Sequence, residues 1–251
     1  MKRILVLSFV LLIAADTALD AQWAKAYGGK DDDWANDIIA APGGGFLVVG
    51  ATKSFKKKPS WVHSYWIFKL KNDGTVLWQK REPIMCESEA TVVLVTRDAK
   101  VAVLVFQSNA SLTTPWGWSR ILKMDRGGNE SYDFSAAYHS SDKDVAGAFC
   151  QVSDGGYHVV GTMSNWPIDS PWQGLMAYKY NKFGVPRTYI CADGPKEDSG
   201  NAVAATSDGG SIVVGRTKSF GAGGSDIWLL KLTSGCEIQW QYTYGDAAED
   251  S

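Results

Sequence analysis

The chain contains the stretch Asp208-Gly209-Gly210-Ser211-Ile212-Val213-Val214-Gly215-Arg216-Thr217-Lys218-Ser219-Phe220, in which a glycine turn leads into an apolar run and a polar exit. Copies of it lie at residues 43–55 and 154–162, and a degenerate copy lies at residues 98–105. The equivalent positions are 55, 56 and 54 residues apart, at Gly50, Val105, Gly161 and Gly215. A fixed period of this length indicates a repeat architecture.

Each repeat has the pattern of four short strands. In the first repeat, alternating apolar residues between turn signals predict strands at residues 36–41, 46–53, 65–71 and 75–80. Asn72-Asp73-Gly74 predicts a tight hairpin between the last two strands, because these residues tolerate positive φ. A lysine ends the third strand of every repeat, at Lys69, Lys123, Lys179 and Lys231. A turn glycine follows each lysine, at Gly74, Gly127, Gly184 and Gly235.

Tandem four-stranded sheets are the units of a β-propeller, in which each blade buries its apolar faces against its neighbours. We therefore predict an all-β fold: a β-propeller-type array of four-stranded antiparallel blades, with four complete repeats of about 55 residues. A β-solenoid is the main rival, but its turns are usually shorter. The repeats are expected at residues 30–83, 84–138, 139–192 and 193–245, between an orphan strand at 22–29 and the start of a fifth repeat at 246–251. We expect an incomplete ring, the front part of a longer array rather than a closed four-blade ring.

Residues 1–21 have the layout of a secretory signal peptide. A basic start is followed by an apolar run at residues 4–15 that is too short to span a bilayer, and then by small residues. We expect a mature domain at residues 22–251 without a membrane span, secreted to the extracellular space, the periplasm or the cell envelope. The net charge of -2 argues against a nucleic-acid partner.

The four cysteines allow three pairings, and the sequence does not choose between free thiols and one disulfide. The chain has neither a CxxC pair nor a Cys/His cluster, so we expect no metal site and no other cofactor.

The repeats follow one signature, which individual copies match with departures: Trp-x-x-x-Tyr-Gly-Gly, then Asp-Gly-Gly-aromatic, then Gly-x-Thr-x-Ser-Phe, then Asp-x-Trp-x-x-Lys-Leu. Together they resemble the tandem propeller-like repeats of exported prokaryotic cell-surface proteins. Residues 208–245 match best, whereas the second repeat departs most, since Ala99 and Val105 replace glycines. The resemblance covers residues 22–251 and implies the propeller architecture, but it implies no single reaction.

An acidic residue recurs thirteen positions before the second strand, at Asp33, Asp144 and Asp198. In the second repeat Ser88 stands there, between Glu87 and Glu89. Carboxylates are calcium ligands, but the spacing of a calcium loop is missing. We favour a structural role, in which each Asp caps the turn into the first strand or pairs with the recurring lysine.

Tryptophans gather in the loops between second and third strands, at Trp61, Trp116, Trp118, Trp166 and Trp172. In a four-stranded meander these loops leave the same edge as the recurring acids. Trp rings beside carboxylates suit a glycan or a peptide, through stacking and hydrogen bonds. Packing of the same rings beneath their own loops is the structural alternative.

We predict a non-catalytic binding or structural module, whose ligand is a glycan or a protein. No nucleophile elbow, zinc-protease motif or phosphate loop occurs in the sequence. One alternative is a carbohydrate-active enzyme, which needs two placed carboxylates. Another is a fragment of a larger surface protein without independent function, which could associate through its open terminal blades.

Overall fold

The computed structural model describes residues 23–55, 62–81, 87–108, 117–139, 145–164 and 173–247. Within these ranges the regular secondary structure is entirely β, with sixteen strands in four antiparallel sheets. This confirms the predicted all-β, propeller-type array of four-stranded blades. None of the described residues forms a helix with the length and apolarity needed to cross a bilayer.

Every sheet is a meander whose strands pair in chain order. The first sheet contains β1 (Asp33–Ala40), β2 (Phe46–Thr52), β3 (Ser64–Leu70) and β4 (Val76–Arg81). The second contains β5 (Glu87–Val95), β6 (Val101–Ser108), β7 (Gly117–Met124) and β8 (Glu130–His139). The third contains β9 (Val145–Gln151), β10 (Tyr157–Ser164), β11 (Gln173–Tyr180) and β12 (Pro186–Ala192). The fourth contains β13 (Asp198–Ala205), β14 (Ser211–Thr217), β15 (Asp226–Leu232) and β16 (Ile238–Tyr244).

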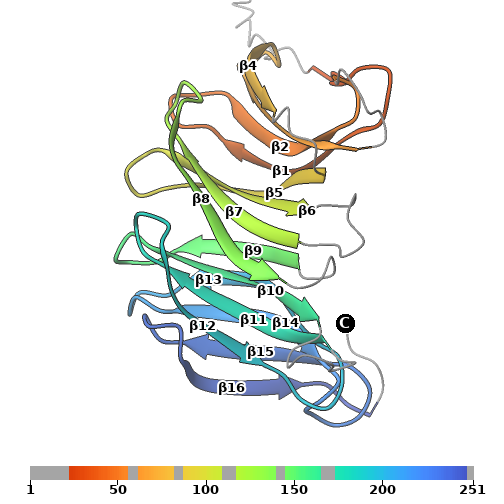
Figure 1. The fold of residues 1–251 in the computed structure, drawn as a ribbon, viewed down its shortest axis with the longest axis vertical. Coiled ribbons are helices and arrows are strands. Elements are labelled where there is room, and N and C mark those ends of the chain that lie inside the picture. Colours follow the sequence, from red (N-terminus) through yellow and green to blue (C-terminus); the bar gives the residue numbers. More distant parts are fainter. Residues whose placement is uncertain are drawn as a thin grey trace, which may run out of the picture.

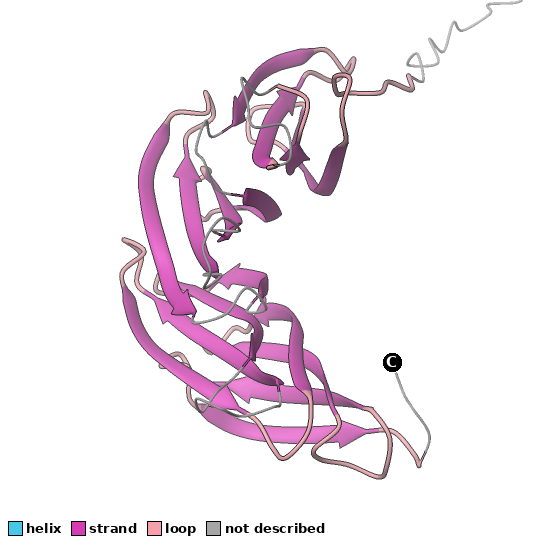
Figure 2. Ribbon diagram, turned by 45° about the vertical axis from the view of Figure 1, so that its right-hand side comes forward, coloured by secondary structure: helices cyan, strands magenta, loops and turns pink. Residues whose placement is uncertain are grey.

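The sheets stack in chain order along an open arc (Figure 1, Figure 2). The first strand of each later sheet packs on the sheet before it, so that β5 contacts β1, β2 and β3, while β13 contacts β9, β10 and β11. We call the face that meets the preceding sheet the leading face and the opposite face the trailing face. The arc does not close, which confirms the predicted incomplete ring.

The hydrophobic core lies between the sheets. Leu47, Val49 and Ile67 on the trailing face of the first sheet belong to one cluster with Val103 and Leu122 on the leading face of the second. Each of these side chains is at most 1% exposed. Burial of an aliphatic side chain contributes roughly 1.5–3 kcal/mol, so contacts between neighbouring sheets carry much of the stability.

A small residue marks the place where a first strand approaches the preceding sheet most closely. Ala90, Ala146 and Gly200 occupy it in the second, third and fourth sheets, and all three are buried. A Cβ on Gly200 would lie only 2.4 Å from Val160 Cγ1. In β1 the equivalent residue is Ala35, which is exposed, since none of the four described sheets lies before the first one.

Residues 23–29 cover the leading face of the first sheet, although they belong to none of its strands. The Tyr27 ring lies 5.4 Å from the Phe68 ring, and Trp23 packs edge-on against Phe46 at 6.4 Å. Trp23 Nε1 also donates to the carbonyl of Asn72 at 2.7 Å. This segment, expected as an orphan strand, therefore caps the first blade.

Candidate functional site

The strand directions bring one set of connections to a single edge of the array. The ends of β2, β6, β10 and β14 and the starts of β3, β7, β11 and β15 lie at this edge, because each pair is antiparallel. We call it the loop edge. The first strands also begin here, since Asp33 pairs with Thr52 and Asp198 pairs with Thr217.

Four of the five predicted tryptophans belong to connections that meet the loop edge, and the fifth, Trp118, belongs to a strand. Trp61, Trp116, Trp166 and Trp172 lie outside the described residues. The backbone of Trp118 lies in β7, opposite Gln107 and Tyr138, but its side chain is outside the described part of the chain. The structure therefore places the bases of these loops and not the rings.

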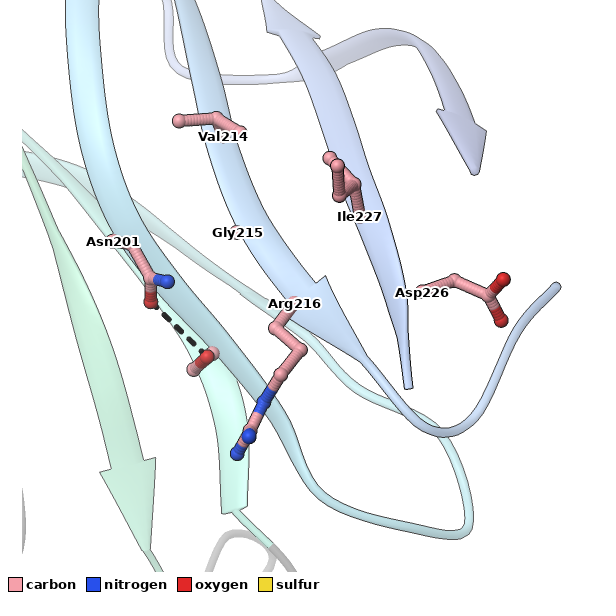
Figure 3. Close-up of a pocket in the computed structure, with 7 residues that line it drawn as sticks. Asn201, Val214, Gly215, Arg216, Asp226 and Ile227 are labelled. Carbon is pink, nitrogen blue, oxygen red and sulfur yellow. Dashed lines mark hydrogen bonds between the residues drawn. The ribbon is translucent and has the colours of Figure 1, made fainter. Parts of the chain in front are cut away.

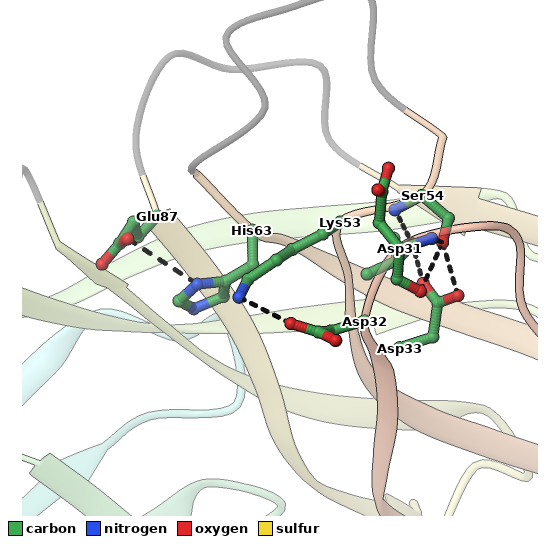
Figure 4. A network of polar contacts seen from close by, with 8 residues as sticks. Asp31, Asp32, Asp33, Lys53, Ser54, His63 and Glu87 are labelled. Carbon is green, nitrogen blue, oxygen red and sulfur yellow. Dashed lines mark hydrogen bonds and ion pairs between the residues drawn. The ribbon is translucent and has the colours of Figure 1, made fainter.

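Asp33 ties the start of β1 to the end of β2. One carboxylate oxygen accepts a hydrogen bond from the Thr52 hydroxyl. The other accepts from the Ser54 hydroxyl at 2.6 Å (Figure 4) and from the Gly29 amide at 2.8 Å. Burial alone would raise the pKa of Asp33, but the hydrogen bonds from Ser54, Thr52 and Gly29 hold it below its usual value.

Asp198 repeats this arrangement in the fourth sheet. Its carboxylate accepts from the Thr217 hydroxyl at 2.5 Å, the Ser219 hydroxyl at 2.7 Å and the Gly194 amide at 2.9 Å. A Cβ on Gly194 would meet the Ser219 Cβ at 2.3 Å, so this corner requires glycine. The Thr-x-Ser motif and the glycine four residues before the aspartate thus donate hydrogen bonds to one carboxylate. We call this arrangement the polar corner. Asp144 lies outside the described residues.

The recurring lysines lie at the opposite edge, so the alternative in which they pair with Asp33 or Asp198 was wrong. Lys123 pairs with Asp98 at 2.8 Å, Lys179 with Asp154 at 2.7 Å and Lys231 with Asp208 at 2.9 Å. These aspartates stand in the turns between first and second strands. In the first sheet Gly43 replaces the turn aspartate, and Lys69 donates to the carbonyl of Pro42 at 3.2 Å instead.

A polar cluster joins the first two sheets at the loop edge. Glu89 Oε1 accepts hydrogen bonds from Trp34 Nε1 and Asn36 Nδ2, both at 2.7 Å. The rings of His63 and Trp34 lie 5.1 Å apart. His63 Nδ1 is 3.8 Å from Glu87 Oε1, and His63 Nε2 is 4.0 Å from Glu89 Oε2 (Figure 4). The His63, Glu87 and Glu89 side chains are 20%, 29% and 28% exposed, so a ligand can reach them.

Sequence reasoning did not single out this cluster. A signal was present, since Glu87 and Glu89 flank Ser88 at the acid position and Trp34 follows Asp33 directly. Ser88 makes a different contact from the acids: its hydroxyl accepts from the Tyr65 amide at 3.0 Å, across the boundary between sheets.

A hollow of about 470 Å³ lies on the trailing face of the last sheet (Figure 3). Ser199, Asn201, Val214, Arg216 and Ile227 line it, and the Ser199 hydroxyl lies 3.2 Å from Asn201 Oδ1. Arg216 and Asp226 point away from one another. Asn201 stands at the register shift of β13, as Asn36 stands at the equivalent register shift of β1. Asn36 donates a hydrogen bond to Glu89 of the next sheet. The hollow therefore corresponds to the place where the next sheet packs in the earlier blades.

The buried titratable groups lie inside the array. Cys150 and Cys236 are buried free thiols, and burial raises the pKa of Cys150 to about 11 and that of Cys236 to about 12. Cys86 lies outside the described residues. The described residues contain no group of three or more His, Cys, Asp or Glu side chains placed to hold a metal ion.

Comparisons with known proteins give no family. No protein-family model matches the chain, and no curated protein matches it. A solved structure described as the crystal structure of the eukaryotic initiation factor aligns at 9% sequence identity and a TM-score of 0.38. The alignment covers 84% of this chain and 56% of that one. This match is too weak to carry an argument about fold or function.

Proposed function

We propose that this chain is an exported, non-catalytic binding module that recognises a glycan of the cell envelope or its surroundings at the loop edge. The observation that carries the proposal is topological. Loops that hold tryptophans in three of the four repeats begin and end at one edge of the array. The cluster of Trp34, His63, Glu87 and Glu89 lies at the same edge.

The chemistry of these side chains suits a sugar. An indole face stacks on the apolar face of a pyranose. Carboxylates accept hydrogen bonds from sugar hydroxyl groups, and an imidazole can accept such a bond or donate one. Glu87 and His63 are partly exposed and supply such groups beside the loop that carries Trp61. The same surface would also accept a peptide, and binding to polysaccharide or to protein distinguishes the two ligands.

The bases of the loops are held rigidly, and this supports a binding role. Asp33 and Asp198 each accept at least three hydrogen bonds, which fix the end of a second strand relative to the start of the first. Rigid supports reduce the conformational entropy that a loop loses when it binds a ligand. The fixed loop bases in the first and fourth sheets therefore support recognition at this edge.

A binding experiment tests the proposal. Residues 22–251 are applied to a glycan array and to pull-downs with isolated envelope polysaccharide and envelope protein. Trp116→Ala and Trp166→Ala should each abolish glycan capture. Trp23→Ala is the matched control, because Trp23 is 39% exposed and bonds to Asn72 at the opposite edge. If glycan capture survives both loop substitutions, the loop edge is not the binding surface. If the chain captures envelope protein and no glycan, the ligand is a peptide.

One observation supports the alternative of a carbohydrate-active enzyme: Glu87 and Glu89 both lie within 4.0 Å of His63. A glycosidase needs two carboxylates about 5–10 Å apart across the scissile bond. Release of reducing ends from a captured glycan, lost in both Glu87→Gln and Glu89→Gln, would favour the enzyme. Tight capture without release favours the binding module.

A further inference from the structure

The outermost strand of the last sheet, β16, has one unpaired edge. It pairs with β15 on one side, and no strand lies on the other side in the described part of the chain. Figure 1 places it at the far end of the array. An unpaired edge offers a row of backbone donors and acceptors to another strand, so proteins normally protect such edges.

The outer strands of the other sheets carry protective residues. Strand β4 contains Lys80 and Arg81, β8 begins with Glu130, and β12 begins with Pro186 and Arg187. Charges and proline on an edge strand discourage pairing with a second chain. Strand β16 has the sequence Ile-Gln-Trp-Gln-Tyr-Thr-Tyr, without a charge or a proline.

The aromatic side chains of β16 are exposed. Tyr242 and Tyr244 are 58% and 54% exposed, and the Trp240 ring lies 5.3 Å from the Tyr242 ring. These three residues alternate along a regular stretch of strand, opposite Lys231, Leu229 and Ile227 of β15. They therefore share the trailing face, which no sheet in the described residues covers.

We infer that β16 pairs antiparallel with β16 of a second copy of this chain, about a two-fold axis at Tyr242. In that register Tyr242 faces its own counterpart and Trp240 faces Tyr244 of the second copy. On the opposite face Gln241 faces Thr243. The three aromatic residues thus meet aromatic residues and Gln241 meets Thr243, and such cross-strand pairs stabilise a sheet.

The symmetry of this contact limits it to two chains. A two-fold contact uses the same patch on both copies and closes on itself, whereas a head-to-tail contact would extend into a filament. The other end of the array is less suited to association, because Trp23 and Tyr27 already cover the leading face of the first sheet. The two fourth sheets would join into one continuous eight-stranded sheet.

Sedimentation of residues 22–251 tests the inference. The unsubstituted chain should be a dimer at about 100 μM, far above the Kd of a specific contact. Tyr242→Lys places two like charges opposite one another and should weaken the dimer by about tenfold or more. Leu77→Lys on β4 is the control, since Leu77 is 52% exposed on a protected strand, and it should leave the dimer unchanged. A mixture of Tyr242→Lys and Tyr242→Glu chains should dimerise again.

Cross-linking tests the register even if the lysine variant folds poorly. Tyr242→Cys should give a covalent dimer on mild oxidation, because directly opposite Cα atoms lie about 4.5–5.5 Å apart, within the range of a disulfide. Lys80→Cys, at the equivalent position of β4, should give no more than the unsubstituted chain with its native thiols. A monomeric parent chain, or equal cross-linking of the two cysteine variants, overturns the inference. Neither readout depends on glycan binding.

Discussion

The indole ring of Trp78 lies against the backbone of Gly128 in the next sheet, so that a Cβ on residue 128 would stand only 3.0 Å from the ring. Trp23 lies over Gly74 in the same way, with a corresponding distance of 2.8 Å. Both glycines have positive φ, at 81° and 76°. The two demands coincide: the turn needs a residue that tolerates this φ, and the packed ring leaves no room for a side chain.

Gly128→Ala should therefore lower the free energy of unfolding by about 1–3 kcal/mol, through strain at positive φ and overpacking against Trp78. Urea denaturation followed by tryptophan fluorescence measures the loss. Gly127→Ala is the control, because a Cβ there would meet only side-chain atoms, at 3.3 Å, and its φ is not positive. Equal losses in both variants would contradict this account of Gly128.

Asp198→Asn should cost about 2–3 kcal/mol of stability, because hydrogen bonds to a buried charged group are among the stronger ones. The asparagine keeps one acceptor oxygen, and its amide nitrogen would face the donors of Thr217 or Ser219. Asp198 is 2% exposed, whereas Asp193 nearby is exposed, so Asp193→Asn serves as the control. Thermal unfolding with a Tm no lower than that of the control would show that the polar corner is not important.

The fold could be predicted because two signals agree. The 55-residue period and the glycine turns both divide the chain into four-stranded units, and the strands predicted at residues 46–53 and 65–71 lie within one residue of β2 and β3. The turn glycines were less secure. In the second and fourth repeats the turn residue with positive φ is Gly128 or Cys236, one position after the predicted Gly127 or Gly235. Two adjacent candidates cannot be ranked from the sequence, because the choice depends on the backbone of the turn.

The contacts of the candidate site were harder to predict. Pairing the recurring lysine with Asp33 ignored a consequence of the meander: β1 begins at one edge and β3 ends at the other, so Asp33 and Lys69 cannot meet. The hydrogen bond from Trp34 to Glu89 depends on how two sheets sit against each other. The sequence pattern within one repeat does not show how that repeat packs against the next one.

Ala99→Gly should stabilise the chain by about 1 kcal/mol. Ala99 replaces a turn glycine in the second repeat and keeps the glycine conformation, with a φ of 55°, which is unfavourable for a residue with a Cβ. Chemical denaturation measures the gain. Ala204→Gly is the control, since Ala204 is an exposed strand residue and the change should cost about 0.5–1 kcal/mol. A loss of stability in both variants would show that the turn is not strained.

His158 gives the fold a dependence on pH. It is fully buried between the third and fourth sheets, with Nδ1 2.8 Å from the Ser211 hydroxyl. Burial, followed by the nearby Lys179, lowers its pKa from 6.5 to about 4. Because the unfolded chain takes up a proton at a higher pH than the folded one, stability should be complete above pH 6.5. It should fall by up to about 3 kcal/mol as the pH drops towards 4.

The His158→Gln variant isolates this effect, because glutamine can keep a hydrogen bond to Ser211 without titrating. We expect the variant to be less stable at neutral pH but to lose less stability between pH 6.5 and 4 than the parent chain. Urea midpoints measured at several pH values give the two curves, and their difference removes the contribution of His63, His139 and the carboxylates. Parallel curves would mean that His158 is protonated in the folded chain as easily as in the unfolded one.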